Sequence, residues 1–175
     1  MKKYFVLGGF IVIAGVLINY ILGGFDPLNA EVVEQPAMVL YGWPYEGSYK
    51  SAALDEQVEK LRQMVQQSPD SGTLTIVNYL QPELEKKGMV RQFTGIVWQQ
   101  QQAGASSLDT LQLAGGEAIR FRLKIRPLIM PTPEKLTRLA TSKAAQMEST
   151  LAGYSIEQYV NDALIVTFPL KTTSE

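Results

Sequence analysis

The longest apolar stretch of the chain lies at its N-terminus. Met1-Lys2-Lys3 precedes a run from Tyr4 to Phe25 in which Asn19 is the only strongly polar residue. About 20 apolar residues match the roughly 30 Å hydrocarbon core of a bilayer at 1.5 Å per helical residue, whereas the apolar part of a cleaved signal peptide usually has about 7 to 15 residues. Residues 1–25 are therefore predicted to form a retained transmembrane anchor, followed by a linker over residues 26–30.

The charges around this run predict its orientation. Two lysines precede it, acidic residues follow from Asp26, and no basic residue follows until Lys50. Because basic residues tend to remain on the cytoplasmic side, the C-terminal part of the chain is expected in the periplasm or outside the cell. The alternative is cleavage after Ala30, which would place Leu28 at a position where a small residue is preferred.

After the linker, the pattern predicts a strand, a helix and two further strands. The order is a strand over residues 31–45 broken at Pro36, a turn over 44–48, a helix from Ser51 as N-cap to Ser68, a strand over 73–79, a polar connection over 81–87 with a helical turn after Pro82, and a strand over 89–100. The helix has apolar residues at helical spacing, namely Leu54, Val58, Leu61 and Val65. A polar loop rich in Gln, Gly and Ser follows over residues 99–107.

The second half predicts the same kinds of element again. The order is a strand over residues 108–113, a turn at Gly115-Gly116, a strand over 117–126, a helix from Thr132 to Gly153 with Pro133 at its first position, a strand or turn over 156–160, and a closing strand over 163–170. The second of these strands alternates strictly: Ile119, Phe121, Leu123 and Ile125 share one face, and Arg120, Arg122, Lys124 and Arg126 share the other. The helix carries Leu136, Leu139, Lys143, Met147 and Leu151 at helical spacing.

The repeated order predicts a duplicated α+β fold. Two strand-helix-strand-strand units favour one antiparallel sheet with both helices covering one face. The apolar stripes of the helices, represented by Val58, Leu61, Leu139 and Met147, are then expected to lie against that common face. A single domain of about 150 residues is of ordinary size for one hydrophobic core.

Composition excludes several kinds of function. The chain has no His and no Cys, so Ser-His-Asp triads, Cys-His pairs, thiolate zinc sites and His-ligated haem are unavailable. The 16 basic residues include Lys2 and Lys3 whereas all 17 acidic residues follow Phe25, so residues 26–175 carry a net charge of −3. A general nucleic-acid binder needs a cationic surplus, and no cofactor or metal is expected.

Two segments resemble a known family. Glu31-Val-Val-Glu-Gln-Pro-Ala-Met-Val-Leu-Tyr41, with Tyr45-Glu-Gly-Ser-Tyr49 and a helix after it, is similar to the opening of the GyrI-like small-molecule-binding domains. Tyr159-Val-Asn-Asp-Ala-Leu-Ile-Val-Thr-Phe-Pro-Leu170 resembles their closing strand. The resemblance spans residues 31–171 and leaves 172–175 as a tail.

The resemblance implies a pseudo-twofold sheet with two helices on one face and a ligand groove on the other, as in effector-binding domains of multidrug-responsive regulators. In that family an acidic residue near the end of the domain often meets lipophilic cations, whereas Ala163 to Leu170 has no carboxylate. The family's usual DNA-binding segment is replaced here by the predicted span. A small or amphipathic ligand, and no nucleic acid, is therefore the expected partner.

Aromatic and basic residues are the candidates for a ligand site. Tyr41, Trp43 and Tyr45 alternate along one strand and can stack on a flat ligand, although a core or edge cluster is the alternative. Trp98, Tyr79, Phe121 and Tyr159 are further candidates for the same groove. The ladder of Arg120, Arg122, Lys124 and Arg126 is suited to an anionic ligand, although a solvated sheet face is the alternative.

Three functions remain open at this point. The first is a membrane-anchored module that binds a small molecule between its two halves. The second is a hydrolase that uses a carboxylate such as Glu46 as general base, for which the sequence has no visible second catalytic group. The third is a structural or interaction protein of the membrane, since a protein partner for the sheet face is also compatible with the pattern.

Overall fold

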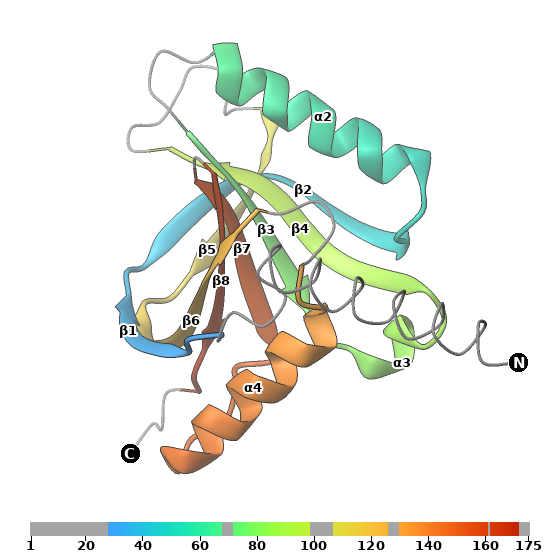
Figure 1. Ribbon diagram of the computed structural model, residues 1–175. Coiled ribbons are helices and arrows are strands. Elements are labelled where there is room, and N and C mark those ends of the chain that lie inside the picture. The colour runs from blue at the N-terminus through green and yellow to red at the C-terminus, as the bar shows by residue number, and fades with distance from the viewer. Residues whose placement is uncertain (1–27, 68–71, 99–106, 126–129, 161, 172–175) are drawn as a thin grey trace, which may run out of the picture.

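The computed structural model describes residues 28–67, 72–98, 107–125, 130–160 and 162–171. These residues form a curled sheet with helices on its outside (Figure 1). In chain order, the elements are β1 (Glu31–Gln35), β2 (Met38–Ser48), α2 (Ala52–Gln67), β3 (Thr73–Tyr79), α3 (Pro82–Glu85), β4 (Met89–Val97), β5 (Asp109–Leu113), β6 (Gly116–Lys124), α4 (Pro133–Gln146), β7 (Tyr154–Val160) and β8 (Ala163–Pro169). The fold class is α+β, as predicted.

The predicted membrane span is outside this part of the chain. Tyr4 to Phe25 and the neighbouring residues up to position 27 are not among those described. Within the described ranges, no helix combines the length and the apolar composition needed to cross a bilayer. The anchor therefore stays a prediction from the sequence.

The strand order places neighbours in sequence far apart in the sheet. The order is β1-β6-β8-β7-β3-β4-β2-β5, with antiparallel pairing throughout. β1 and β2 are separated only by Pro36 and Ala37, yet they lie near opposite ends of this order, so the sheet curls back towards itself. A Cβ on Gly115 would lie 2.8 Å from the Ala37 nitrogen and 2.9 Å from the Gln35 oxygen. The β5–β6 connection therefore crosses directly against the β1–β2 connection, and glycine makes the crossing possible.

The two halves of the sheet have equivalent arrangements. β2, α2, β3 and β4 follow the same order as β6, α4, β7 and β8. In the sheet, β2-β4-β3 and β6-β8-β7 run inward from opposite ends and meet where β3 pairs with β7. The strand that precedes each half pairs with the other half, since β1 joins β6 and β5 joins β2. The halves are thereby tied together at both ends as well as in the middle.

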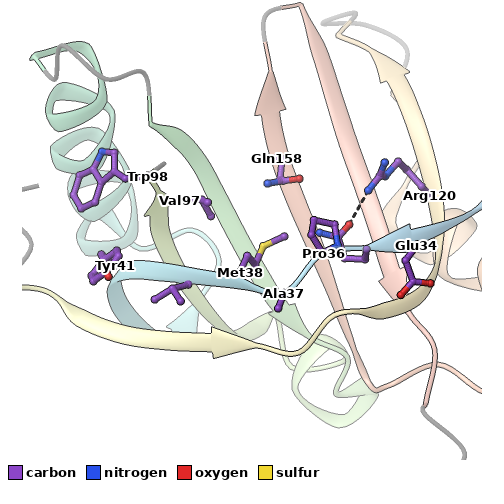
Figure 2. A pocket seen from close by; sticks show the side chains of 11 residues that line it. Glu34, Pro36, Ala37, Met38, Tyr41, Val97, Trp98, Arg120 and Gln158 are labelled. Carbon is purple, nitrogen blue, oxygen red and sulfur yellow. Dashed lines mark hydrogen bonds between the residues drawn. The ribbon is translucent and has the colours of Figure 1, made fainter. Parts of the chain in front are cut away.

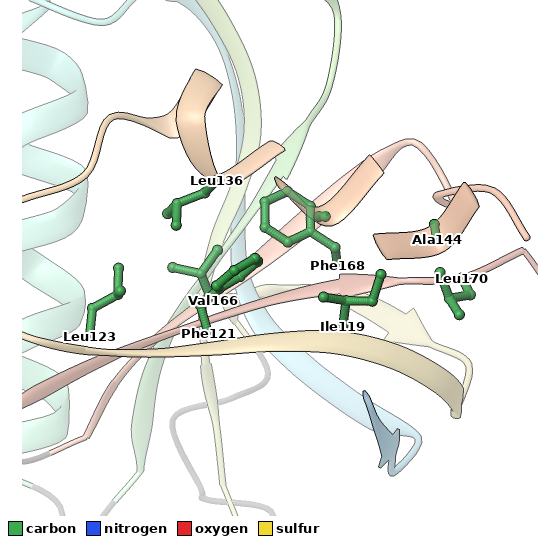
Figure 3. Packing of buried hydrophobic residues seen from close by; sticks show 9 residues of the cluster. Ile119, Phe121, Leu123, Leu136, Ala144, Val166, Phe168 and Leu170 are labelled. Atoms are coloured by element: carbon green, nitrogen blue, oxygen red, sulfur yellow. The ribbon is translucent and has the colours of Figure 1, made fainter. Parts of the chain in front are cut away.

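Both long helices cover the same face of the sheet. On α2, Leu61 is fully buried against Leu74 and Ile96, with Val58 partly buried beside it. On α4, the residues that pack onto β6 and β8 are Leu136, Ala140 and Ala144, with Leu139 and Met147 at the border of the cluster (Figure 3). Adjacent strands are in register along Phe121, Val166, Glu157, Ile76 and Thr94. Paired residues share a face, so the two helices lie against one common face, as the sequence predicted.

Two predicted boundaries are wrong, and one alternative that the sequence left open is decided. β2 continues through Pro44 to Ser48, because β5 pairs only with its residues 38–42 and the strand has a single neighbour beyond them. Proline is tolerated at such an edge position. α4 ends at Gln146 rather than Gly153, and Glu148 then adopts a φ of 55° that turns the chain. Residues 154–160 form a full strand, which the sequence had left open between strand and turn.

The start of α4 is as predicted. The Thr132 hydroxyl accepts a hydrogen bond from the Lys135 nitrogen at 3.3 Å, with Pro133 at the first helical position. Proline and a capping hydroxyl satisfy two requirements of a helix N-terminus locally. This element was therefore predictable without tertiary information.

Candidate functional site

The candidate site is a pocket of about 600 Å³ between the two halves of the sheet. It is bordered by β1, the β1–β2 connection and β2, by the end of β4, and by β6 and β7. The lining residues are Glu34, Gln35, Pro36, Ala37, Met38, Val39, Tyr41, Val97, Trp98, Arg120 and Gln158 (Figure 2). The pocket thus exists only because the sheet curls and β1 crosses from one half to the other.

One end of the pocket is polar and contains a cation. Arg120 Nη2 donates a hydrogen bond to Gln35 Oε1 at 2.7 Å, and Arg120 Nε donates to Thr167 Oγ1 at 3.5 Å. Nearby, Gln158 Nε2 donates to Thr75 Oγ1 at 3.5 Å. Within the described part of the chain, Arg120 forms no ion pair. The guanidinium is therefore held in place by neutral groups alone.

The other end is aromatic. The rings of Tyr41 and Trp98 lie with centroids 5.6 Å apart and planes tilted by 34°. Met38 and Val97 lie between this pair and the polar end (Figure 2). Trp98 Nε1 is buried without a hydrogen-bond partner among the described residues, packed against Gly72. The pocket is therefore amphipathic along its length.

The charged side chains of Glu34 and Arg120, which both border the pocket, point in different directions. Figure 2 shows the Glu34 carboxylate on the opposite side of β1 from Arg120. This agrees with the β1–β6 register, in which Glu31 is paired with Arg120 and Glu34 with Glu117. Residues i and i+3 of a strand point to opposite faces. Glu34 is thus directed away from Arg120, whereas Glu31, the cross-strand partner of Arg120, is on the same face as Arg120.

The structure separates the predicted site residues into three groups. Tyr41, Trp98 and Arg120 line the pocket. Tyr45 and Tyr79 line a second, smaller pocket of about 340 Å³. The remaining three, Trp43, Phe121 and Arg122, line neither of these two pockets. The eight residues therefore do not form one groove, contrary to the sequence-based expectation.

Burial explains two of these corrections. Phe121 is fully buried beneath α4, because the apolar positions of β6 face the helices. Trp43 shares a face with Tyr41 and Tyr45, as predicted, but this is the face that α2 covers, and Trp43 packs beside Leu61. Tyr41 and Trp98 are on this face as well, and Trp98 packs in the same cluster as Leu61, so alternation alone did not identify which aromatic residues line the pocket.

The basic ladder of β6 is on the face opposite the helices. Arg120, Arg122 and Lys124 are paired with Thr167, Ile165 and Ala163 of β8. Arg122 and Lys124 are exposed, whereas Arg120 is partly buried. Arg126, the fourth predicted member, is outside the described residues. Of the three members that the structure describes, Arg120 alone lines the pocket.

The sequence analysis did not identify a partly buried carboxylate on the helix-covered face. Glu157 of β7 accepts a hydrogen bond from Asn78 Nδ2 at 2.9 Å. Burial raises the pKa of Glu157, and the bond from Asn78 partly opposes this. The closing strand lacks an acid, as noted from the sequence, but Glu157 pairs with Val166 of that strand. Recognising residues 154–160 as a strand would have indicated its position.

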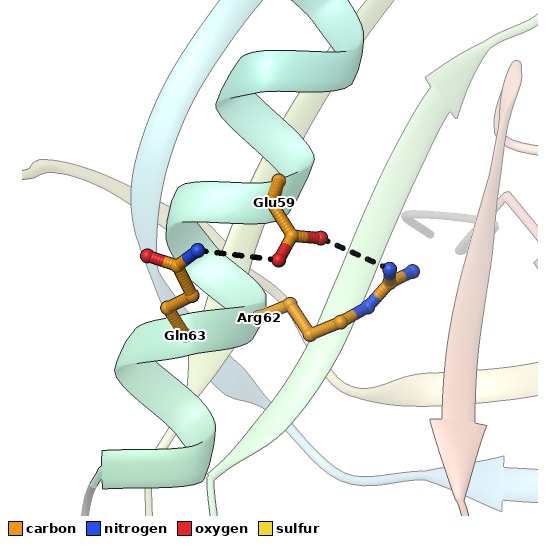
Figure 4. A network of polar contacts seen from close by, with 3 residues as sticks. All are labelled: Glu59, Arg62 and Gln63. Carbon is orange, nitrogen blue, oxygen red and sulfur yellow. Dashed lines mark hydrogen bonds and ion pairs between the residues drawn. The ribbon is translucent and has the colours of Figure 1, made fainter.

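The charge of Glu157 also affects the pKa of a neighbouring tyrosine. Burial raises the pKa of the Tyr159 hydroxyl, the charge of Glu157 raises it further, and Arg62 of α2 lowers it. Arg62 is itself 3.2 Å from Glu59, which also accepts a bond from Gln63 (Figure 4). The helix-covered face therefore has its own polar cluster, separate from the pocket.

Glu46, the candidate general base, is a surface residue. Its side chain is 57% exposed and lies 3.7 Å from Arg91 Nε. The Arg91 guanidinium is in turn 5.4 Å from the ring centroid of Tyr79. A general base works best when shielded from water beside its substrate, and Glu46 is not shielded.

In sequence, the chain matches no family model and no curated protein. In structure, it is similar to the C-terminal domain of EcmrR, with a TM-score of 0.54 and 13% identity over 83% of this chain and 99% of that one. EcmrR in a complex with DNA gives a TM-score of 0.56 and 13% identity, over 98% of this chain and 70% of that one. A hydrolase from Listeria innocua gives a TM-score of 0.53 and 12% identity, over 87% of this chain and 98% of that one.

At these identities the likeness shows the fold alone. The fold shared with the C-terminal domain of EcmrR is the one that the resemblance to GyrI-like small-molecule-binding domains implied. The residues of the site are not transferred from these proteins. That this chain has no nucleic-acid partner stays a prediction from its charge.

Proposed function

We propose that this protein is a membrane-anchored module that binds a small molecule outside the cytoplasm, in the pocket between its two halves. The observation that carries the proposal is the composition of that pocket, whose lining includes a guanidinium with neutral hydrogen-bond partners, the apolar side chains of Met38 and Val97, and the Tyr41–Trp98 pair. Its volume of about 600 Å³ is within the range of small-molecule sites, roughly 300–1,000 Å³.

The anchor and the location rest on the sequence. The apolar run of Tyr4 to Phe25 with its preceding lysines supports a single span and a non-cytoplasmic domain. The described domain begins shortly after this run, at residue 28. A binding module held this close to a bilayer has access to amphipathic compounds that concentrate at the membrane surface.

The hydrolase alternative has less support. It requires a carboxylate shielded from water and directed at a bound substrate. Glu46 is exposed, Glu34 is directed away from Arg120, and Glu157 is on the opposite face of the sheet from Arg120. The resemblance in fold to a Listeria hydrolase does not supply the missing group.

A thermal-shift experiment distinguishes ligand binding from the alternative of a structural or interaction protein. Thermal unfolding of the full-length chain is measured with anionic, neutral, cationic and lipid-like compounds. A compound that binds only the folded state must raise the melting temperature, and raise it further as its concentration increases. A rise with at least one class, abolished when Met38 is replaced by Arg to fill the pocket, is the expected result. Unchanged melting with every class would contradict the proposal.

A further inference from the structure

The chain enters the described domain on the side where β6 ends. β1 begins at Glu31, opposite Arg120, and runs back towards the start of β6. Because the two strands are antiparallel, the residues before Glu31 approach from the side where β6 ends. Leu28 is partly buried and packs against the buried cluster beneath α4, which includes Leu123 near that end of the strand. The linker from the predicted span therefore reaches the domain on this side.

α4 begins on the same side. Figure 3 shows Leu136, in the first turn of α4, on the side of Leu123, and Ala144, near the end of the helix, on the side of Leu170. Leu123 is near the end of β6, whereas Leu170 follows β8. The linker, the end of β6 and the start of α4 are therefore together at one end of this half of the sheet, called the linker end below.

Two large apolar side chains are exposed at the linker end. Ile125 follows β6 and is 43% exposed, and Met130 precedes α4 and is 36% exposed. Single exposed apolar residues are ordinary on protein surfaces. These two, however, flank the same connection and lie on the side from which the linker arrives. Apolar side chains beside basic ones are typical of surfaces that lie at the boundary between lipid headgroups and acyl chains.

Cations exceed acids at the linker end. Lys124 of β6 and Lys135 and Arg138 of α4 are exposed, and none of the three forms an ion pair within the described ranges. The exposed acids there are Glu134 in the first turn of α4 and Asp162 in the turn between β7 and β8. A surplus of basic residues close to a bilayer favours contact with anionic lipid headgroups.

The other long helix has the opposite charge balance. α2 contains three acidic and two basic residues, and both basic residues, Lys60 and Arg62, are paired with glutamates of the same helix at 2.9 and 3.2 Å. α4 contains three basic residues and one acidic residue. Figure 1 shows α2 over the other half of the sheet, apart from α4. The unpaired cations therefore distinguish the α4 half from the α2 half.

The short linker keeps the linker end close to the predicted span. Three steps of about 3.8 Å separate the Cα atoms of Phe25 and Leu28, so these atoms are at most about 11 Å apart. The headgroup layer on each side of the hydrocarbon is roughly 5 to 8 Å thick. The side of the domain that holds Leu28 is therefore at the level of the headgroups or directly above them.

We propose that the linker end docks on the bilayer that holds the chain's own anchor, with Lys124, Lys135 and Arg138 on anionic headgroups and Ile125 and Met130 inserted among them. This inference rests on the anchor of the proposed function and goes beyond it, because an anchor alone leaves the domain free to turn on its linker. Docking fixes the orientation of the domain, with α4 at the membrane and α2 away from it.

Energy transfer from a dye on the domain to a headgroup-labelled lipid measures this orientation. The chain has no Cys, so one dye is attached through Ser142→Cys on the exposed side of α4, or through Gln63→Cys on the exposed side of α2. The full-length chain is placed in nanodiscs of phosphatidylcholine alone, or with about 30% phosphatidylglycerol.

The expected result is a transfer that depends on lipid charge for α4 alone. Transfer from the dye on α4 should be at least about twofold greater in the anionic nanodiscs than in the zwitterionic ones. About 0.5 M NaCl should abolish this gain, because it shortens the screening length to about 4 Å. Transfer from the dye on α2 should stay low in both kinds of nanodisc.

Two matched double variants assign the effect to the cations of α4. One Lys or Arg near an anionic bilayer changes the equilibrium by about fivefold, so Lys135→Gln with Arg138→Gln should reduce the ratio of docked to undocked domain by about 25-fold. Lys60→Gln with Arg62→Gln removes the same charge from α2 and should leave the transfer from the dye on α4 unchanged. Ile125→Ser should lower this transfer without changing its dependence on salt.

Each outcome has a distinct meaning. A chain that does not enter nanodiscs has no anchor, which refutes the membrane part of the proposed function and the docking with it. Equal transfer from the dye on α4 in both lipids, or greater transfer from the dye on α2, overturns the docking but leaves the anchor. An equal loss in the two double variants overturns it as well. The series of lipids and salt with all cations present decides the question even if a double variant fails to fold.

Discussion

Asn78 Nδ2 donates a hydrogen bond of 2.9 Å to Glu157 Oε1 across the junction between the two halves of the sheet. The two residues belong to β3 and β7, the central pair of strands, and are 79 positions apart. The bond supplies one partner to a carboxyl group that burial makes difficult to ionise. Folding therefore favours the protonated form of Glu157.

This relationship predicts a pH-dependent stability. Since burial raises the pKa of Glu157 in the folded state above the unfolded value of 4.5, the folded state loses stability as the pH rises through the interval between the two values. Glu157→Gln should therefore be more stable than the wild-type chain at pH 8, and the difference should vanish below about pH 4. Urea unfolding over this pH range measures it.

Glu59→Gln is the control for this effect. Glu59 is 53% exposed and forms a surface pair with Arg62, so its replacement should change the free energy of unfolding by less than about 1 kcal/mol. A Glu157→Gln variant whose stability follows the wild-type curve at every pH would show that Glu157 is adequately solvated.

Leu61→Ala tests the packing of α2. Leu61 is fully buried against Leu74 and Ile96, so the substitution should reduce the free energy of unfolding by about 2 to 5 kcal/mol. The exposed neighbour Gln63 provides a control, since Gln63→Ala should cost less than about 0.5 kcal/mol. A similarly small loss in Leu61→Ala would mean that the helix presents another side to the sheet.

Gly42→Ala tests the close approach of β2 and β4. Gly42 is paired with Gly95, and a Cβ at Gly42 would overlap the carbonyl oxygen of Thr94. Because backbone atoms must move, a loss of about 1 to 3 kcal/mol is expected from thermal or urea unfolding. Gly47→Ala in the same strand meets only the ring of Tyr45, which can rotate, and should cost less. Equal effects of the two substitutions would contradict this account.

The anchor is tested on the protein extracted from membranes. Mass spectrometry should find the mass of the chain with residues 1–25 retained, because the apolar run is long enough to span a bilayer. Protease added to spheroplasts should degrade the domain, because the preceding lysines orient it outward. An N-terminus at Glu31 would refute retention of the anchor. Protection of the domain from protease would refute its orientation.

Local pattern was sufficient for most elements. The alternation of β6 predicted both of its faces, because apolar residues that pack under a helix must occur at every second position of a strand. The beginning of α4 was predictable because its cap and its proline act within one turn. In both cases the interaction that determines the structure lies within a few residues.

Tertiary contacts determined the ends of β2 and α4, which the local pattern predicted wrongly. Pro44 remains within β2 because the strand has lost its second neighbour there, which no local signal reveals. Leu151 continued the helical period of α4, but it bridges Leu170 and packs at the border of the α4 cluster after the helix has ended. Apolar residues at helical spacing indicate contact with the core. A residue in a turn beside the core can make this contact as well as a residue in a helix.

The sequence by itself determined the class of the fold, the order of its elements and the buried face of β6. The tertiary structure decided which aromatic residues pack in the core and which of the three described basic residues of β6 lines a pocket. The reason is that strand partners are chosen by contacts between distant segments. Gln35 and Arg120 are 85 positions apart, and they meet only because β1 crosses to the other half of a curled sheet.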